Sequence, residues 1–280
     1  MKLTIIGTGL IGGSIALKLR EKQFIDYVYG VDQNEQHLVE AKELGIIDEG
    51  STLESAVQNS DLIILAIPVD AARKLLPSVL DLVNDQQTVM DVGSTKGGIV
   101  KAANAHKNRK RFVAFHPMWG TENSGPQSAI SDSFTGRAGV ICDQDDSAQD
   151  ALKMVEQVAK HLEMNLLYMD SEGHDIHTAY ISHISHITSY ALANTVLEKE
   201  REEDTIFQLA SSGFSSTVRL AKSHPEMWVP IFRQNKENVL DVLNEHITQL
   251  RKFKSALEKD NYEYLEELIR NANKIRGILR

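Results

Sequence analysis

The chain has 280 residues, of which 42% are hydrophobic and 25% are charged, and this length and composition suit a globular protein of two domains. The formal net charge of -9 disfavours nucleic acid as a partner, because an acidic surface repels the phosphate backbone. One cysteine, Cys142, excludes a disulfide within the chain, and no leader or membrane-spanning run is apparent. We therefore expect a cytoplasmic protein that is not bound to a membrane.

The first part of the sequence alternates short apolar runs with amphipathic stretches. The apolar runs predict strands at residues 3–6, 27–31, 62–67, 88–92, 111–115, 139–142 and 165–169. The stretches 11–20 and 34–44 have helical periodicity. Strands separated by helices indicate βαβ units, so we expect an α/β domain with a doubly wound parallel sheet over residues 1–168.

The second part, residues 169–280, shows no convincing strand. Its periodicity predicts helices at residues 171–197, 204–210, 217–220, 227–257 and 262–280. Asp260 and Glu263 have the spacing of a capping box before the last of these helices. An apolar stripe recurs at three- and four-residue steps, which fits either ordinary core or a seam between subunits: Val239, Leu243, Ile247, Leu250 and Leu257.

A glycine-rich turn joins the first predicted strand to the first helix. Residues 7–12 read Gly-Thr-Gly-Leu-Ile-Gly, a G-x-G-x-x-G pattern in the context that dinucleotide binding requires. Gly7 permits the tight turn, Gly9 lets the backbone approach a pyrophosphate, and Gly12 lets the helix pack closely on the strand. We expect the phosphates at the helix N-terminus, with Leu10 and Ile11 in the same loop.

The acidic residue at the end of the second predicted strand selects the cofactor. Asp32 has the spacing of the carboxylate that binds the adenosine ribose hydroxyls, and it would repel a 2′-phosphate. Gln33 and Asn34 follow it and supply no arginine for such a phosphate. NAD is therefore favoured over NADP, and we assign Pro68, which ends the third apolar run, to the same cofactor site.

Two further segments follow strands, where ligands bind in doubly wound sheets. Residues 91–97 read DVGSTKG and residues 116–122 read HPMWGTE. His116 has the chemistry of a general base, and the Ser94 hydroxyl can orient it or hydrogen-bond a reacting hydroxyl. The alternative for His116 is a hydrogen-bonded histidine at a strand end, without catalytic function.

A run of histidines lies on the first helix of the second part: His174, His177, His183 and His186. Their spacing resembles a metal site, but no H-E-x-x-H pattern or cysteine supports one, so we expect no metal. A polar lining for an anionic substrate is the preferred interpretation. Further along, the small-residue segment 211–218 leads to Arg219, whose guanidinium suits capture of a carboxylate.

Together these segments resemble the prephenate and arogenate dehydrogenase family of tyrosine biosynthesis. The motifs are GTGLIGGS from Gly7, DVGSTKG from Asp91, HPMWGTE from His116, HDIHTAYISHISH from His174, SSGFSSTVRLA from Ser211 and MW…NKEN from Met227. The resemblance covers nearly the whole chain in order. It implies a nucleotide-binding domain followed by a helical domain that forms a homodimer.

The resemblance also implies roles for individual residues. His116 would be the catalytic base, and Ser94 its hydrogen-bonding partner at the substrate hydroxyl. Arg219 would bind the ring carboxylate, and Glu122 would sit near the entrance and pair with Arg219. The remaining substrate-binding residues would be Thr121, His174, Ser182 and His186. Ser215 and Trp119 depart from residues common in the family, which affects substrate preference.

The expected reaction is NAD-dependent oxidative decarboxylation of prephenate to 4-hydroxyphenylpyruvate. Arogenate, which would give tyrosine directly, is the alternative substrate. A hydroxyacid dehydrogenase would need a catalytic lysine on the helix that contains residues 174–186, and there is none. A non-catalytic NAD-sensing regulator would not need His116, Ser94 and Arg219 together. From the length we expect neither a fused chorismate mutase nor an added regulatory domain.

Overall fold

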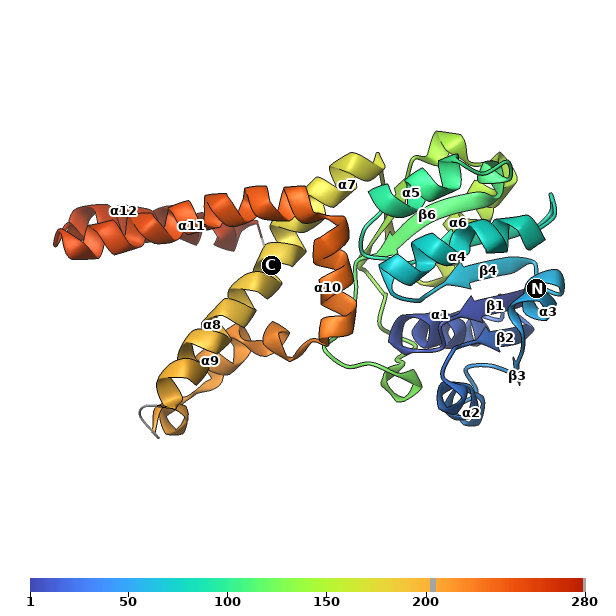
Figure 1. The fold of residues 1–280 in the computed structure, drawn as a ribbon, viewed down its shortest axis with the longest axis horizontal. Coiled ribbons are helices and arrows are strands. Elements are labelled where there is room, and N and C mark those ends of the chain that lie inside the picture. The colour runs from blue at the N-terminus through green and yellow to red at the C-terminus, as the bar shows by residue number, and fades with distance from the viewer. Residues whose placement is uncertain (202–204, 279–280) are drawn as a thin grey trace. The chain divides into compact units, whose positions relative to one another are not determined.

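The computed structural model describes residues 1–201 and 205–278. They belong to two compact units, Met1–Asn235 and Lys236–Arg280. The first unit contains a sheet and the helices around it, and the second unit is helical (Figure 1).

The first unit is built on an eight-stranded sheet with the order β3-β2-β1-β4-β5-β6-β7-β8. The strands are β1 Lys2–Ile6, β2 Tyr27–Val31, β3 Glu49–Gly50, β4 Leu62–Leu65, β5 Thr88–Asp91, β6 Phe112–Pro117, β7 Ala138–Cys142 and β8 Asn165–Met169. All seven predicted strands are present, and the short β3 was not predicted. The expectation of a wholly parallel sheet is wrong at one place, because β7 runs antiparallel to β6. The β6–β7 connection contains only one 3₁₀ turn, Pro126–Ser128, instead of the helix that a parallel crossover uses.

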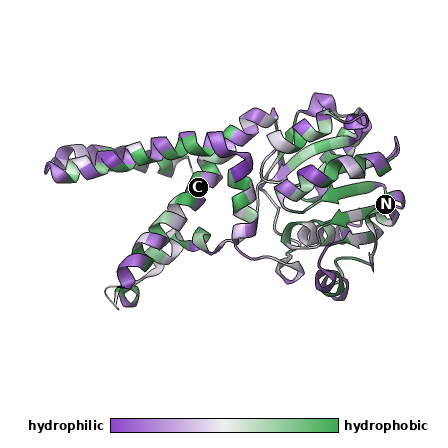
Figure 2. Cartoon of the chain, viewed as in Figure 1, coloured by the Kyte–Doolittle hydropathy of each residue, from purple (hydrophilic) through white to green (hydrophobic). Residues whose placement is uncertain are grey.

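Helices cover both faces of this sheet, as the doubly wound expectation requires. On one face the core includes residues of α1 Leu10–Glu21, α2 Glu35–Glu43 and α6 Gln149–His161. On the other face it includes residues of α3 Leu53–Gln58, α4 Val69–Leu82 and α5 Gly97–Asn104. Strand β4 shows why these strands are continuously apolar: Leu62 and Ile64 enter the first core, whereas Ile63 and Leu65 enter the second. The strands are accordingly hydrophobic along their length (Figure 2).

The remaining helices of the first unit follow β8. They are α7 Ser171–Thr178, a π-helical turn Ala179–His183, α8 Ile184–Glu200, α9 Ser212–Thr217 and α10 Pro225–Gln234. The helix predicted at 171–197 is confirmed, with the π turn inside it. The helix predicted at 204–210 is a 3₁₀ turn, Ile206–Leu209, and residue 204 lies outside the described residues. The helix predicted at 217–220 is wrong, because α9 ends at residue 217 and a 3₁₀ turn, Arg219–Lys222, follows.

The single helix predicted at 227–257 is divided at Asn235 into α10 and α11. The second unit contains α11 Lys236–Glu258, α12 Tyr262–Asn273 and a 3₁₀ turn Lys274–Gly277. The capping box predicted at Asp260 is wrong: Asp260 has φ +50°, and the Asn261 side chain accepts the cap hydrogen bond from the Tyr264 amide at 3.1 Å. No helix in the described part of the chain is long and apolar enough to cross a membrane.

Candidate active site

The glycine turn after β1 has a backbone that larger residues would disrupt. Gly7 has φ +95°, and a Cβ there would lie 2.4 Å from the Ala66 carbonyl oxygen. A Cβ on Gly12 would lie 2.2 Å from the Gly7 carbonyl oxygen, so α1 packs directly on the turn. At Gly9, by contrast, the nearest atom to such a Cβ is the Gly125 amide nitrogen at 3.8 Å.

The N-terminus of α1 is open to an anion. Gly9 is its N-cap, no side chain caps the first turn, and that turn contains no acidic residue. Backbone N–H groups at such a terminus bind phosphate through hydrogen bonds and the helix dipole. The turn and the helix therefore fit a dinucleotide pyrophosphate.

Asp32 follows β2 and is held beside the same turn. One of its carboxylate oxygens accepts hydrogen bonds from the Thr8 amide at 3.0 Å and the Thr8 hydroxyl at 3.1 Å. The other oxygen accepts from the Asn34 amide at 2.9 Å. This fixed negative charge suits ribose hydroxyls and repels a 2′-phosphate. Pro68 lies at the start of α4, just after β4.

His116 lies within β6, and not after it as expected, and begins a chain of hydrogen bonds. Its Nδ1 is 2.8 Å from Nε2 of His174 on α7. Nδ1 of His174 is 2.9 Å from Oδ1 of the adjacent Asp175. His174 is only 1% exposed, so its ring nitrogens bond His116 and Asp175 and do not reach solvent.

Burial keeps His116 neutral. Desolvation, together with the nearby His174, Lys96 and His183, holds the pKa of His116 well below its usual value. The imidazole is therefore unprotonated at neutral pH, as a general base must be.

A buried ion pair lies under the segment that contains Ser94. Lys96 is fully buried, and its ammonium donates to Asp91 Oδ2 and, at 2.7 Å, to the Phe115 carbonyl oxygen. Burial raises the pKa of Asp91. Ser94 lies in the loop between β5 and α5, beside this pair, and is partly exposed.

Arg219 and Glu122 form an ion pair with 3.0 Å between Nη1 and Oε2. Glu122 lies in the segment that follows His116, so its ion pair brings Arg219 next to the segment that begins at His116. The Arg219 side chain is 52% exposed and that of Glu122 is 26% exposed, which leaves the guanidinium accessible to a ligand. The Thr121 hydroxyl accepts from the Asn123 amide at 3.2 Å.

Two further histidines of α7–α8 pack against α10. The His186 ring stacks on Trp228 with 3.4 Å between ring centroids, and its Nδ1 bonds the Ser182 carbonyl oxygen at 3.0 Å. Nδ1 of His183 is 3.2 Å from the Asn235 side-chain amide. Burial lowers the pKa of both histidines, that of His183 to about 4. Among the residues that the structure describes, no group of three or more His, Cys, Asp or Glu side chains could hold a metal ion.

The sequence did not single out the polar residues around the histidines: Lys96, Asp91, Asp175 and Asn235. Lys96 and Asp91 belong to the DVGSTKG motif, and Asp175 follows His174, so the signal was present in two of the quoted motifs. A sequence does not show that the two segments meet at hydrogen-bonding distance.

Comparison with known proteins assigns the family. Residues 15–169 match the family described as prephenate dehydrogenase, nucleotide-binding domain, and residues 170–271 match prephenate dehydrogenase, dimerization domain. A prephenate dehydrogenase of Bacillus subtilis is 30% identical over 99% of this chain and 76% of that protein. A cyclohexadienyl dehydrogenase of Zymomonas mobilis is 26% identical over 99% of this chain and 96% of that protein.

A solved structure agrees with these matches. It is a prephenate dehydrogenase of Aquifex aeolicus, in complex with hydroxyphenyl propionate and NAD+, and it superposes with a TM-score of 0.91 at 31% identity, covering 100% of this chain and 98% of that one. On this similarity in sequence and fold, the chain belongs to the prephenate dehydrogenase family.

Proposed function

We propose that this chain catalyses the NAD-dependent oxidative decarboxylation of prephenate to 4-hydroxyphenylpyruvate in tyrosine biosynthesis. The observation that supports it best is His116, a buried neutral imidazole at the end of β6. Parallel strands β1, β4, β5 and β6 end at one edge of the sheet, so His116 shares that edge with the glycine turn.

The cofactor is NAD, held by the turn and by Asp32. Gly7, Gly9 and Gly12 shape the pyrophosphate site, and the other proposed contacts in this region are Leu10, Ile11 and Pro68. Asp32 binds the ribose hydroxyls. When NAD is bound, its nicotinamide accepts a hydride from the substrate.

His116 removes the proton of the ring hydroxyl, which Ser94 also hydrogen-bonds. The C4 hydride leaves, the C–C bond to the ring carboxylate breaks, and its electron pair enters the ring as carbon dioxide departs. The ring becomes aromatic, and the new phenolate oxygen recovers the proton from His116. Aromatisation supplies the driving force, so the protein mainly orients the substrate and handles one proton.

Arg219 binds the ring carboxylate through two parallel hydrogen bonds. In a protein of net charge -9, a dianionic substrate needs such a local positive group. Glu122 lies at the entrance and holds the guanidinium until the substrate arrives. The other proposed lining residues are Thr121, Ser182, His186 and, behind His116, His174.

We further propose a homodimer formed through the helical domain, residues 169–280, with the nucleotide domain at 1–168. The apolar stripe on α11 supports this, since Leu250 and Leu257 are each 56% exposed. Sedimentation at micromolar concentration should show a dimer, and a stable monomer would refute the proposed dimer interface on α11. The acidic charge argues against a nucleic acid partner, and a biosynthetic role suits the cytoplasm.

The substrate is tested by the rate of NADH formation with prephenate and with arogenate, each with NAD and with NADP. We expect prephenate with NAD to give the highest kcat/KM. Arogenate is the second candidate, because a cyclohexadienyl dehydrogenase is among the relatives. Binding of NAD without turnover of either acid would favour a sensor and refute the proposal.

A further inference from the structure

We infer that Asp175 and His174 are positioning residues that fix the tautomer of His116 and share the proton that it takes up. The inference rests on the proposed function, in which His116 is the base. It adds a role for Asp175, and it places His174 behind the base.

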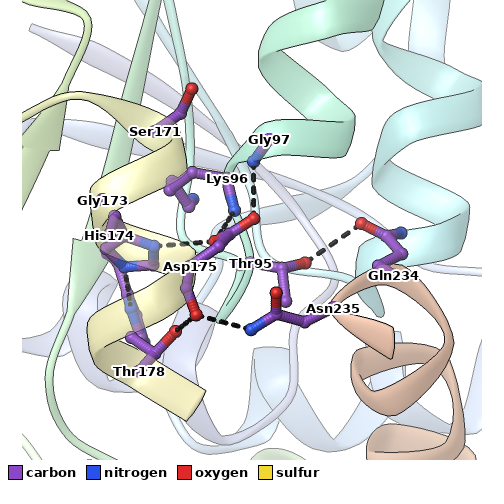
Figure 3. A network of polar contacts seen from close by, with 12 residues as sticks. Thr95, Lys96, Gly97, Ser171, Gly173, His174, Asp175, Thr178, Gln234 and Asn235 are labelled. Carbon is purple, nitrogen blue, oxygen red and sulfur yellow. Dashed lines mark hydrogen bonds and ion pairs between the residues drawn. The ribbon is translucent and has the colours of Figure 1, made fainter. Parts of the chain in front are cut away.

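Asp175 is held in one orientation by backbone groups. Its Oδ1 accepts from the Lys96 amide at 2.8 Å and its Oδ2 from the Gly97 amide at 2.9 Å, at the start of α5 (Figure 3). A Cβ on Gly97 would lie 3.1 Å from Oδ2, so the carboxylate packs tightly on the backbone. The Asp175 main chain is fixed too, because its carbonyl oxygen accepts from the Asn235 side-chain Nδ2 at 2.6 Å and from the Thr178 hydroxyl at 3.2 Å.

This anchoring determines where each proton lies. A carboxylate only accepts hydrogen bonds, so His174 must donate through Nδ1 to Asp175. In neutral His174 the other nitrogen, Nε2, is then an acceptor, and His116 must donate to it through Nδ1. Nε2 of His116 therefore has the free lone pair and is the atom that removes the substrate proton.

The same chain provides a place for the positive charge. The groups that face the two rings are Lys96 from the β5–α5 loop, His183 from the π turn, and Asp175 itself. Lys96 and His183 disfavour a charge on His116. When His116 takes a proton at Nε2, its Nδ1 proton can transfer along the 2.8 Å hydrogen bond to Nε2 of His174, which places the imidazolium against the Asp175 carboxylate.

Asp175→Ala tests the tautomer. Without the carboxylate, no acceptor holds the proton of His174 on Nδ1, so neither His174 nor His116 is fixed in the productive tautomer. We expect kcat to fall by about 10²–10⁴-fold, as happens when the orienting aspartate of a serine protease is lost, with KM and NAD affinity little changed. Asp170→Ala is the matched control: this exposed cap of the same helix accepts from the Gly173 amide, and its kcat should stay within about twofold of wild type.

His174→Gln separates positioning from proton sharing. Its amide can donate to Asp175 and accept from His116, so it preserves the tautomer but cannot take a proton. We expect kcat to fall by about tenfold, less than in Asp175→Ala, and the acidic limb of the pH profile of kcat/KM to shift. Equal loss in both variants, with an unshifted limb, would overturn the proton-sharing part.

Nitrogen-15 NMR of the histidine rings reads the tautomer directly, and the wild-type spectrum does not depend on turnover or on either variant folding. Wild type should show His116 protonated at Nδ1 and free at Nε2, and Asp175→Ala should lose this single fixed tautomer. A wild-type His116 protonated at Nε2 would overturn the inference even if the enzyme turns over prephenate. The predicted tautomer in a protein without prephenate turnover would instead refute the proposed function alone.

Discussion

The exposed ion pair between Arg219 and Glu122 gives two opposite predictions for substrate binding. Arg219→Ala removes the proposed partner of the ring carboxylate, and loss of such a charge-assisted pair costs about 2–4 kcal/mol, or about 30- to 1,000-fold in kcat/KM. The loss should appear mainly in KM, because the carboxylate is charged both before and during the reaction. Arg219→Lys should recover only part of it, since an ammonium lacks the planar fork.

Glu122→Gln should have the reverse effect. The pair spans 3.0 Å but Arg219 is half exposed, so the competition that it offers to the substrate is worth about 0.2–1 kcal/mol. Releasing the guanidinium should therefore lower KM for prephenate by at most about fivefold.

The assay is steady-state NADH formation at varied prephenate concentration, with NAD affinity measured separately. Arg233→Ala is the matched control, because Arg233 forms an equally long exposed pair with Asp70 at 3.0 Å. An unchanged KM in Arg219→Ala, or weakened NAD binding with KM unchanged, would show that Arg219 is structural and that the carboxylate binds elsewhere.

Lys96→Met leaves the Asp91 carboxylate buried without its partner and should lower the free energy of unfolding by about 3–5 kcal/mol in urea denaturation. The exposed Lys101→Met, on α5, should change it by under about 0.5 kcal/mol, and similar values for the two variants would contradict a stabilising buried pair. Gly12→Ala places a Cβ 2.2 Å from the Gly7 carbonyl oxygen and should weaken NAD binding at least tenfold in a titration, whereas Gly213→Ala, with open space around it, should not. Native NAD affinity in Gly12→Ala would argue against the turn as the cofactor site. Burial, together with the neighbouring His174, Lys96 and His183, lowers the pKa of His116, so the base stays neutral as pH falls through about 6.5 and kcat/KM should decline only below that pH. A decline centred at or above about 6.5 would mean that His116 is not the titrating base.

Sequence periodicity predicted most of the first unit because its central strands are buried on both faces. β4 is apolar at all four positions, a pattern that a half-buried strand does not have. The direction of β7 was not predictable in this way, since an apolar run reads the same in both directions. It depends on whether the connection from β6 forms a helix, and here it contains only a 3₁₀ turn.

The helical part was harder to predict because small, local choices decide where each helix ends. Asn235 interrupts a continuous periodic pattern, and its side chain bonds the Asp175 carbonyl oxygen, a contact far away in sequence. At the start of α12, Asp260 and Asn261 compete to be the cap, and the left-handed φ of Asp260 gives the position to Asn261.

The residues of the candidate site likewise differ in how far the sequence predicts them. His116, Ser94 and Arg219 were predicted from the sequence because each lies in a motif with its own chemical signature. The roles of Lys96 and Asp175 arise only when two segments meet in space: the Asp175 carboxylate caps amides next to Lys96. Such a contact has no periodicity, so it becomes visible only in the structure.

The central claim is that His116 is the base of an NAD-dependent decarboxylation of prephenate. Its most direct test is the turnover of prephenate and NAD by wild type and by His116→Asn, with NADH and carbon dioxide measured together. We predict equimolar NADH and carbon dioxide in wild type, and a kcat lower by about 10²–10⁴-fold in the variant at nearly unchanged KM. A variant with near-native kcat, or NADH formed without carbon dioxide, would contradict the account.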